Sequence, residues 1–287
     1  MPHFPLMCDE PFFCLEKTHY KQVSPAPVRC PGRSDWRRII CQSPCWIVQM
    51  SFTLKISADH DARGLQAAFA ACGRLQVPNF LEADSAKTLR QLLTSNETWH
   101  LTYNEGKENF ESGTAEFNAL APAQQQRFMA NVYGRARGSF QYLFKQYYIS
   151  QAIKLGEQPG HALHPLHDCV NSDGFLNWMR TLTNRPQINH SDCYASCYEP
   201  GHFLTEHNDL HTTQNRIAAW VISMTPDWNP DWGGYLAFFD ETGNIETAFK
   251  PSYNTLNIFS IPQRHAVQLV APFAGHARTS LLGWLQK

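Results

Sequence analysis

The stretch Tyr198-Glu-Pro-Gly201-His-Phe-Leu204-Thr-Glu-His207-Asn-Asp209 decides how this 287-residue chain is interpreted. Gly201 predicts a turn, and the residues after it predict a strand that ends in a histidine and an aspartate. Residues two apart on an extended strand point to the same face. We therefore expect the His207 imidazole and the Asp209 carboxylate to lie side by side.

A second histidine, His265, follows in another strand-like segment and completes a candidate metal site. With His207 and Asp209 it would close one triangular face of an octahedral metal. Two imidazoles and one carboxylate with three open positions are typical of Fe(II) oxygenases. The open positions can take a chelating 2-oxo acid and dioxygen. The alternative for His265 is an ordinary strand histidine in the core or on the surface.

Arg278 lies 13 residues after His265, which leaves room for a turn and a return on the next strand. An arginine suits the far carboxylate of a 2-oxo acid because its planar fork donates two parallel hydrogen bonds. Ser280 shares the face of Arg278, so its hydroxyl could bond the same carboxylate. The alternative for Arg278 is a solvated strand arginine.

A second His-x-Asp motif, His190-Ser-Asp192, needs a separate interpretation. In a chain with 13 histidines, a single match of this kind is weak evidence. The residues before it, 185–189, include Pro186 and Asn189 and are typical of a loop. We therefore expect His207 and Asp209, not this pair, to bind metal.

Several segments together form a pattern that is more specific than any one of them. They are Tyr198-x-x-Gly201-x-x-Leu204-x-x-His207-x-Asp209, Thr225-Pro-Asp-Trp-Asn-Pro-Asp-Trp-Gly-Gly234, Asn254-Thr-Leu-Asn-Ile-Phe259, His265-x-Val267, Arg278-x-Ser280-x-x-Gly283-Trp284 and, more weakly, Arg74-Leu-Gln-Val-Pro-Asn-Phe-Leu81. The pattern resembles the prolyl-hydroxylase branch of the 2-oxoglutarate/Fe(II) oxygenases. Within it, the resemblance is to the catalytic domain of predicted proline hydroxylases related to those that act on a ribosomal protein.

This resemblance implies a role for each matching residue. The iron ligands would be His207, Asp209 and His265, and Arg278 would hold the distal carboxylate of 2-oxoglutarate. Tyr198 would hydrogen-bond the cosubstrate, with a barrel-core tyrosine as the alternative. The cofactors would be Fe(II), 2-oxoglutarate and O2, with ascorbate as a reductant. One departure from the family is a longer gap between His265 and Arg278, where Pro272-Phe-Ala-Gly275 widens the turn.

Length and charge agree with one enzyme domain. A chain of 32.8 kDa can bury one large core. A formal net charge of −1 gives no electrostatic case for nucleic acid or for an anionic membrane surface. No apolar run approaches the roughly 20 residues that span a bilayer. We expect a cytoplasmic protein with reduced cysteines, and its oligomeric state stays open.

The first 49 residues differ from the rest of the chain. They hold five of the nine cysteines and seven of the 18 prolines, without hydrophobic periodicity. We expect a disordered extension or a misassigned start, with residues 50–287 forming the oxygenase domain. A zinc site built from Cys30, Cys41, Cys45 and His19 is the disfavoured alternative, because the spacing fits no standard pattern.

The remaining pattern predicts an α+β fold. Helices are expected at 61–72, 85–93, 121–148 and 173–182, the last capped by Ser172, and strands at 75–81 and 99–103. Residues 104–120 and the histidine-rich 150–171 are predicted to be loops, and the histidines of 150–171 are not expected to bind metal. Eight strands follow, at 191–198, 202–207, 215–224, 234–239, 246–249, 255–260, 265–270 and 276–285. Their spacing favours a jelly roll, or double-stranded β-helix, over residues 191–287, with helices from 60–190 packed on one sheet.

Three functions are consistent with this pattern. The favoured one is a 2-oxoglutarate-dependent dioxygenase that hydroxylates a C–H bond of a prolyl residue in a protein. The second is the same chemistry on a free amino acid or small metabolite, because the fold does not fix the substrate. The third is a jelly-roll protein that binds metal and ligand without turnover.

Overall fold

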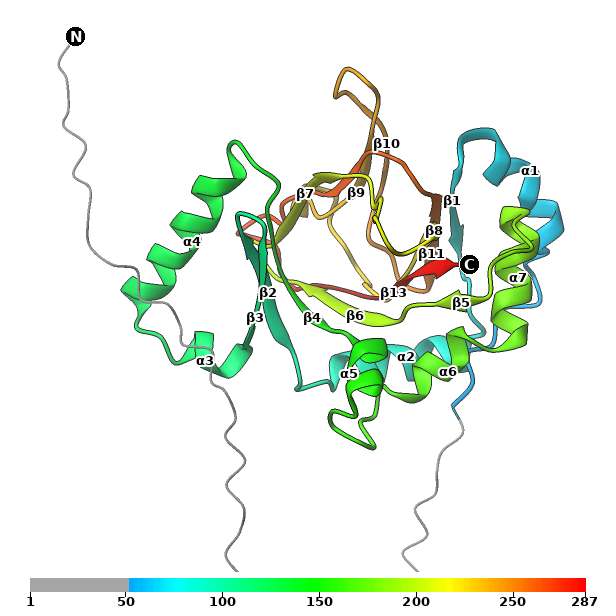
Figure 1. The fold of residues 1–287 in the computed structure, drawn as a ribbon, viewed down its shortest axis with the longest axis horizontal. Coiled ribbons are helices and arrows are strands. Elements are labelled where there is room, and N and C mark those ends of the chain that lie inside the picture. The colour runs from blue at the N-terminus through cyan, green and yellow to red at the C-terminus, as the bar shows by residue number, and fades with distance from the viewer. Residues whose placement is uncertain (1–51) are drawn as a thin grey trace, which may run out of the picture. The chain divides into compact units, whose positions relative to one another are not determined.

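Strands supply most of the architecture in the computed structural model, which describes residues 52–287. Thirteen of them form one antiparallel sheet that curls into a nearly closed barrel (Figure 1). They are β1 (Arg74–Pro78), β2 (His100–Glu105), β3 (Glu108–Gly113), β4 (Tyr142–Tyr147), β5 (His190–Ser191), β6 (Tyr194–Tyr198), β7 (Phe203–His207), β8 (Arg216–Ser223), β9 (Leu236–Phe239), β10 (Ile245–Phe249), β11 (Thr255–Ser260), β12 (His265–Val267) and β13 (Arg278–Gln286). The expected jelly roll and α+β class are therefore confirmed. The expected extension and the zinc alternative lie outside the described residues.

The order of the strands brings distant segments together. Neighbours run β1-β11-β8-β13-β6-β4-β7-β12-β9-β10, and β2 extends from β4 to the hairpin partner β3. Strand β13 lies between β8 and β6, so the last strand of the chain is central. Strand β12 lies between β7 and β9. This arrangement places the C-terminal segments 265–267 and 278–286 beside the strand that ends in His207.

Helices cover the outer face of the sheet on one side and the hairpin on the other (Figure 1). They are α1 (Ala62–Cys72), α2 (Ala83–Thr94), α3 (Thr114–Asn118), α4 (Pro122–Ala136), α5 (Ile149–Leu155), α6 (Pro165–Val170) and α7 (Asp173–Thr183), with a short 3-10 helix, η1 (Pro230–Trp232). Ser172 caps α7 by accepting a hydrogen bond from Phe175 N, as predicted. No helix among residues 52–287 is both long and apolar enough to cross a membrane.

Alternation along β13 separates the two faces of the sheet. Leu281 and Leu285 are fully buried in the core that α2, α6 and α7 share with the sheet. Arg278, Leu282 and Trp284 line the cavity on the opposite face. The period of two therefore gives one strand an apolar outer face and a functional inner face.

Two expectations for residues 104–148 are wrong. The predicted helix 121–148 ends at Ala136, and residues 142–147 form β4. The predicted loop 104–120 contains β3 and α3. Apolar residues in 140–147 fit both a helical and an alternating pattern, and pairing with β2, β6 and β7 decides for the strand. Strands β1 and β2 correspond to the strands expected at 75–81 and 99–103, whereas β3 and β4 are not among the expected strands.

The expected connector 150–171 contains two short helices, α5 and α6. Its histidines form hydrogen bonds to side chains of other segments. His164 Nε2 is 2.9 Å from the Tyr147 hydroxyl, and His161 Nε2 is 3.2 Å from Thr98 Oγ1. That these histidines do not bind metal stays a prediction.

Candidate active site

Three predicted ligand residues converge inside the barrel. His207 and His265 face each other across the β7–β12 ladder, and their ring centroids are 4.1 Å apart. His207 Nε2 lies 3.4 Å from Asp209 Oδ1, and His265 Nε2 lies 3.4 Å from Asp209 Oδ2. Ligand atoms of the three residues all lie within 4.8 Å of one another. They are the sole cluster of three or more His, Cys, Asp or Glu side chains in residues 52–287 with the spacing of a metal site.

The Asp209 carboxylate reaches this position through a turn. Strand β7 ends at His207, and Asp209 has a φ of +61°, in the left-handed region. The expectation that both residues share one face of an extended strand is therefore wrong in its geometry. Aspartate tolerates this conformation better than most residues. Arg216 supports the turn, because its Nη1 donates to the Asp209 carbonyl at 3.3 Å.

Backbone carbonyls fix the orientation of both imidazoles. His207 Nδ1 is 3.0 Å from the Thr205 carbonyl oxygen, and His265 Nδ1 is 2.8 Å from that of Gln263. A carbonyl only accepts, so each Nδ1 carries the proton and each Nε2 keeps a free lone pair. Both lone pairs belong to the atoms nearest Asp209. This is the tautomer that a metal-binding histidine requires.

The environment of Asp209 favours the carboxylate form. Burial alone raises the pKa of this carboxyl, but the polar contacts of Asp209 with the His207 and His265 rings outweigh burial and leave the pKa well below its ordinary value. The three side chains therefore offer one anionic oxygen donor and two neutral nitrogen donors. That donor set suits a divalent iron with open positions.

Arg278 lies on the same cavity wall and is 4 % exposed. It is paired in register with Tyr198, and its guanidinium carbon is 5.1 Å from the Tyr198 ring centre. Burial lowers the pKa of Arg278, and burial raises the pKa of Tyr198 despite the nearby arginine. The guanidinium therefore faces a neutral phenol and no carboxylate.

Two buried polar atoms beside this cavity have no hydrogen-bond partner, Arg278 Nε and Ser280 Oγ. Buried donors without partners are rare in folded proteins and call for an explanation. An anionic ligand on this wall would accept from both. The residues present therefore fit the distal carboxylate of a 2-oxo acid. Tyr198 lies beside Arg278, and its hydrogen bond to the cosubstrate stays a prediction.

The wide turn between His265 and Arg278 leaves the strand register intact. Gly275 packs on Trp232, and a Cβ at this glycine would lie 2.9 Å from the indole ring. The His276 ring also contacts Trp232 edge to face at 5.0 Å. The extra residues thus dock on the Trp228–Trp232 segment outside the ladder.

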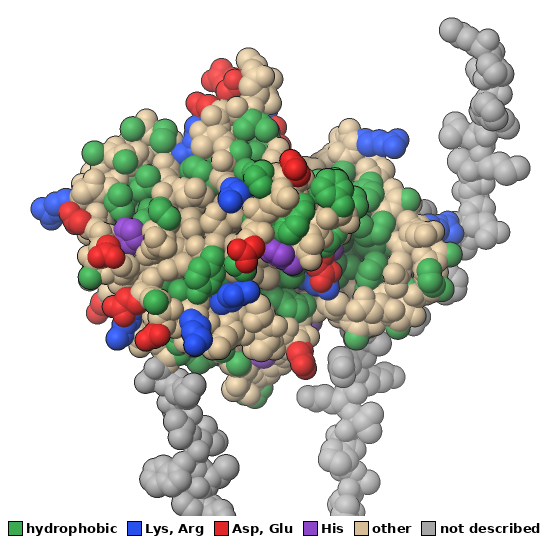
Figure 2. Space-filling view, turned by 180° about the vertical axis from the view of Figure 1, so that it is seen from behind, with side chains coloured by type: hydrophobic (Ala, Val, Ile, Leu, Met, Phe, Trp, Pro, Cys, Tyr) green, Lys and Arg blue, Asp and Glu red, His purple; other side chains and the backbone are tan. Residues whose placement is uncertain are grey.

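The cavity has a volume of about 630 Å³ and reaches the surface. An aromatic ladder runs along its wall, because the Phe140, Tyr142, Phe144 and Tyr198 rings follow one another at 4.7–5.7 Å between centroids. Phe140 is 46 % exposed and forms the outer end. Figure 2 shows histidine and acidic side chains beside a hollow that hydrophobic side chains border.

Sequence reasoning missed five of the wall residues. They are Phe140, Tyr142, Phe144, Arg216 and Trp284. Arg216 stacks on the Trp284 ring at 3.5 Å and lies 3.9 Å from Asp209 Oδ1. The alternation of aromatic residues at 140, 142 and 144 was the available signal for the first three. No sequence signal joins Arg216 to Trp284, because their contact depends on the pairing of β8 with β13.

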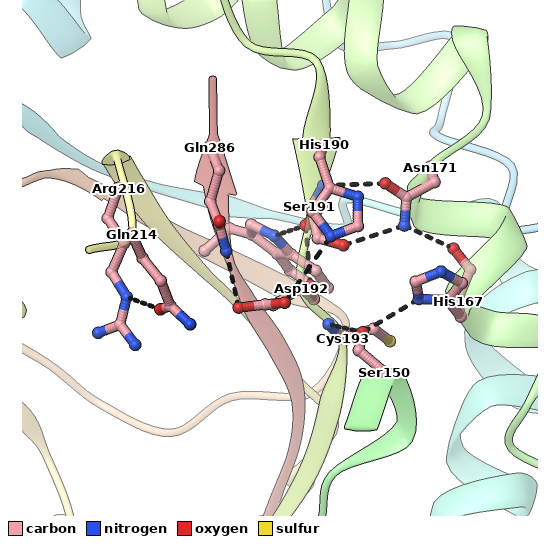
Figure 3. Close-up of polar contacts among 11 residues, drawn as sticks. Ser150, His167, Asn171, His190, Ser191, Asp192, Cys193, Gln214, Arg216 and Gln286 are labelled. Atoms are coloured by element: carbon pink, nitrogen blue, oxygen red, sulfur yellow. Dashed lines mark hydrogen bonds and ion pairs between the residues drawn. The ribbon is translucent and has the colours of Figure 1, made fainter. Parts of the chain in front are cut away.

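The second His-x-Asp motif is bonded into the fold instead (Figure 3). Asp192 Oδ2 accepts from Gln286 Nε2 at 2.8 Å, and His190 Nε2 lies 3.8 Å from Asp192 Oδ1. The Ser191 hydroxyl between them accepts from Trp220 Nε1 at 2.8 Å, and the Ser191 backbone N donates to Asn171 Oδ1 at 2.9 Å. These side chains point to different partners, as expected for a structural motif.

Comparison with known proteins agrees with this geometry. Residues 193–286 match the family model of the 2OG-Fe(II) oxygenase superfamily, and this range contains all six predicted site residues. The C-terminal part of the jelly roll is therefore similar to this superfamily. The family name gives the cofactors as Fe(II), 2-oxoglutarate and O2, and the triad supplies a suitable donor set. No curated protein matches the chain significantly.

Solved structures of 2OG-Fe(II) oxygenases and prolyl hydroxylases have a fold similar to that of this chain. One is a prolyl hydroxylase from Trichoplax adhaerens in complex with a peptide fragment of hypoxia inducible factor. It is 16% identical to this chain in sequence, and the two structures superpose with a TM-score of 0.53 over 85% of this chain and 94% of that one. A 2OG-Fe(II) oxygenase family oxidoreductase from Burkholderia pseudomallei is 14% identical with a TM-score of 0.50, covering 82% and 95%. At these low sequence identities, the similarity shows a shared fold only.

Proposed function

We propose that this protein is a 2OG-Fe(II) oxygenase that hydroxylates a prolyl residue of a polypeptide. Iron ligands in this proposal are His207, Asp209 and His265, and contacts to the distal carboxylate of 2-oxoglutarate are Arg278, Ser280 and Tyr198. The observation that carries the assignment is a pair of buried polar atoms without a hydrogen-bond partner among residues 52–287. They are Arg278 Nε, on the wall of the cavity that holds the triad, and Ser280 Oγ, two residues further along β13.

Each part of the cavity has a task in this proposal. When bound, iron and 2-oxoglutarate supply an oxidative decarboxylation that is coupled to hydroxylation of a substrate C–H bond. His207 and His265 keep their Nε2 lone pairs available because both Nδ1 protons are donated to carbonyls. Arg278 fixes the cosubstrate by its far end. Aromatic rings along β4 exclude water and orient the substrate.

Cavity shape favours a polypeptide over a free amino acid. A volume of about 630 Å³ leaves room for a ligand well beyond the size of 2-oxoglutarate. Its rim carries apolar side chains that reach solvent, Phe140 at 46 % and Leu210 at 64 % exposure. A small metabolite would leave these uncovered, whereas an extended peptide would cover them. The Trichoplax neighbour holds a peptide, which supports the same class of substrate here.

Two alternatives remain from the sequence. Hydroxylation of a small metabolite needs the same triad and differs only in the substrate. A binding protein without turnover would keep the same ligand sites and would release no succinate. Cytoplasmic location and ascorbate as the reductant stay predictions.

The decisive experiment measures succinate release from 2-oxoglutarate by anaerobically purified protein after addition of Fe(II), ascorbate and O2. Proline-containing peptides are then analysed for the mass of one added oxygen atom. His207→Ala should abolish turnover, and excess 2-oxoglutarate should partly restore it in Arg278→Ala. Succinate release together with a modified metabolite and no modified peptide would show that the substrate is a metabolite instead of a polypeptide. Failure of the wild-type protein to bind iron would refute the assignment.

A further inference from the structure

A cluster of buried polar groups joins β2, β4 and β7 next to the candidate iron site. Gln141, which directly precedes β4, is fully buried, and Asn104 in β2 is 2 % exposed. Both are amides, which lose free energy on burial unless their hydrogen bonds are replaced. Neither amide contributes a ligand atom to the triad. Their burial therefore calls for a structural or functional reason.

The two amides hold the backbone of residues 140–142 from several sides. Gln141 Nε2 donates to the Asn104 carbonyl at 2.9 Å and to the Tyr142 carbonyl at 3.1 Å. Asn104 Nδ2 donates to the Phe140 carbonyl at 2.9 Å, and its Oδ1 accepts from Tyr142 N at 3.2 Å. Arg135 of α4 donates from Nε to Gln141 Oε1 at 3.2 Å. This segment is therefore fixed by side-chain bonds before β4 begins.

Residue 141 is bonded in turn to β7. Gln141 N donates to Thr205 Oγ1 at 2.9 Å, and Thr205 N donates to the Gln141 carbonyl at 3.0 Å. The Thr205 carbonyl is the group that accepts from His207 Nδ1 at 3.0 Å. The position of Thr205 thus depends on Gln141 on one side and sets the imidazole on the other. On its outer side the ring also lies near Phe140, at 5.8 Å between centroids.

We propose that Gln141 and Thr205 are positioning residues for the His207 imidazole. The proposal rests on the function proposed above, since it takes His207 to be an iron ligand. Thr205 holds the carbonyl that fixes the tautomer and the angle of the ring, and Gln141 holds Thr205 through a two-way bond. Loss of either restraint lets the ring turn away from the metal. Partners of this kind typically change metal affinity by about 10- to 100-fold.

The test is a metal titration of Thr205 variants with Co(II), which replaces Fe(II) without oxidation. Thr205→Val keeps the shape of the side chain and removes the acceptor for Gln141 N, whereas Thr205→Ser keeps the acceptor. Thr255→Val is the matched control, because Thr255 is 2 % exposed and bonds the Tyr253 carbonyl far from the triad in sequence. Urea unfolding of each metal-free variant measures stability separately from affinity.

We expect Thr205→Val to bind Co(II) about 10-fold more weakly or worse, and Thr205→Ser to bind close to wild type. Thr255→Val should lose stability and keep its affinity. Wild-type affinity in folded Thr205→Val would overturn the proposal. If Thr205→Val does not fold, Gln141→Met takes its place. We expect Gln141→Met to bind Co(II) more weakly, and an unchanged Co(II) affinity would contradict the proposal. Wild-type protein that binds no Co(II) would instead refute the proposed function.

Discussion

Arg278 lies directly opposite Tyr198 in the β6–β13 ladder, with its guanidinium carbon 5.1 Å from the Tyr198 ring centre. The charge is buried against a neutral phenol, and its Nε has no partner. A buried cation without an anion destabilises the protein that contains it. An anionic ligand would pair with this charge. Replacing the arginine should therefore weaken ligand binding without lowering the stability of the ligand-free protein.

Arg278→Met should weaken 2-oxoglutarate binding while leaving the metal-free protein as stable as before, or more stable by about 1 kcal/mol. Removing the buried cation that pairs with a carboxylate lowers the affinity at least about 30-fold. Urea unfolding gives the stability, and titration of 2-oxoglutarate into Co(II)-loaded protein gives the affinity. Arg278→Lys keeps the charge without the fork and should bind with intermediate affinity. Tight binding in Arg278→Met would remove this residue from the cosubstrate site.

In the metal-free protein, Asp209→Asn should lower the stability less than Asp209→Ala. The φ of +61° at this position disfavours alanine by about 1 kcal/mol, whereas asparagine adopts this conformation more readily. Both substitutions remove the anionic donor, so both should lose most of the Co(II) affinity. Equal stability of the two variants in urea unfolding would show that the turn relaxes. Retained Co(II) binding in either would exclude Asp209 as a ligand.

His190→Ala should leave Co(II) affinity and succinate release unchanged. This histidine is part of the second His-x-Asp motif, and its Nε2 is 3.8 Å from Asp192 and remote from the metal cluster. His190→Ala is the control for His207→Ala, because each substitution removes the histidine of a His-x-Asp motif. A drop in metal stoichiometry for His190→Ala would reveal a second site.

Glycine-to-alanine substitutions at Gly283 and Gly134 should have opposite effects on stability. A Cβ at Gly283 would lie 1.8 Å from the Asp192 carbonyl oxygen, so β13 or β5 must shift, at a cost of about 3 kcal/mol. Nothing lies within 4 Å of a Cβ at Gly134, inside α4. Alanine there should stabilise the helix by about 0.5–1 kcal/mol. Thermal or urea unfolding distinguishes the two, and a neutral Gly283→Ala would contradict the close approach of these strands.

Buried His202 should make the protein less stable in mild acid. Burial lowers its pKa from 6.5 to about 4, and its Nδ1 accepts from Glu199 N at 3.1 Å. Below pH 6.5 the unfolded chain binds a proton that the folded chain accepts only near pH 4, so stability falls as the pH drops through this window. The full difference is about 3 kcal/mol.

His202→Asn provides the comparison for this pH dependence, because its Oδ1 can replace Nδ1 as the acceptor. Urea unfolding at about pH 7.5 and about pH 4.5 should show a smaller loss for the variant than for the wild type. The same loss in both would assign the acid sensitivity to other groups.

The sequence predicted the C-terminal half well and residues 104–148 poorly. Strands from β6 onward are short and separated by turns, so the local pattern was sufficient. Residues 121–148 contain a real helix start at Pro122 and apolar residues that suit either a helix or a strand. Pairing of β4 with β2, β6 and β7 resolves the ambiguity, and such partners are invisible to a local pattern.

Residue identity and spacing determined the donor set of the site by themselves. His207, Asp209, His265 and Arg278 stand out because their chemistry is specific and their separations fit strand, turn and return. Tertiary structure decided how they meet: a left-handed turn at Asp209 brings its carboxylate to both histidines. It also decided the aromatic wall, the Arg216–Trp284 stack and the Gln141–Thr205 link, since each joins residues from different strands or loops whose proximity depends on sheet register. A short sequence motif encodes which atoms can bind, whereas long-range pairing sets where those atoms lie.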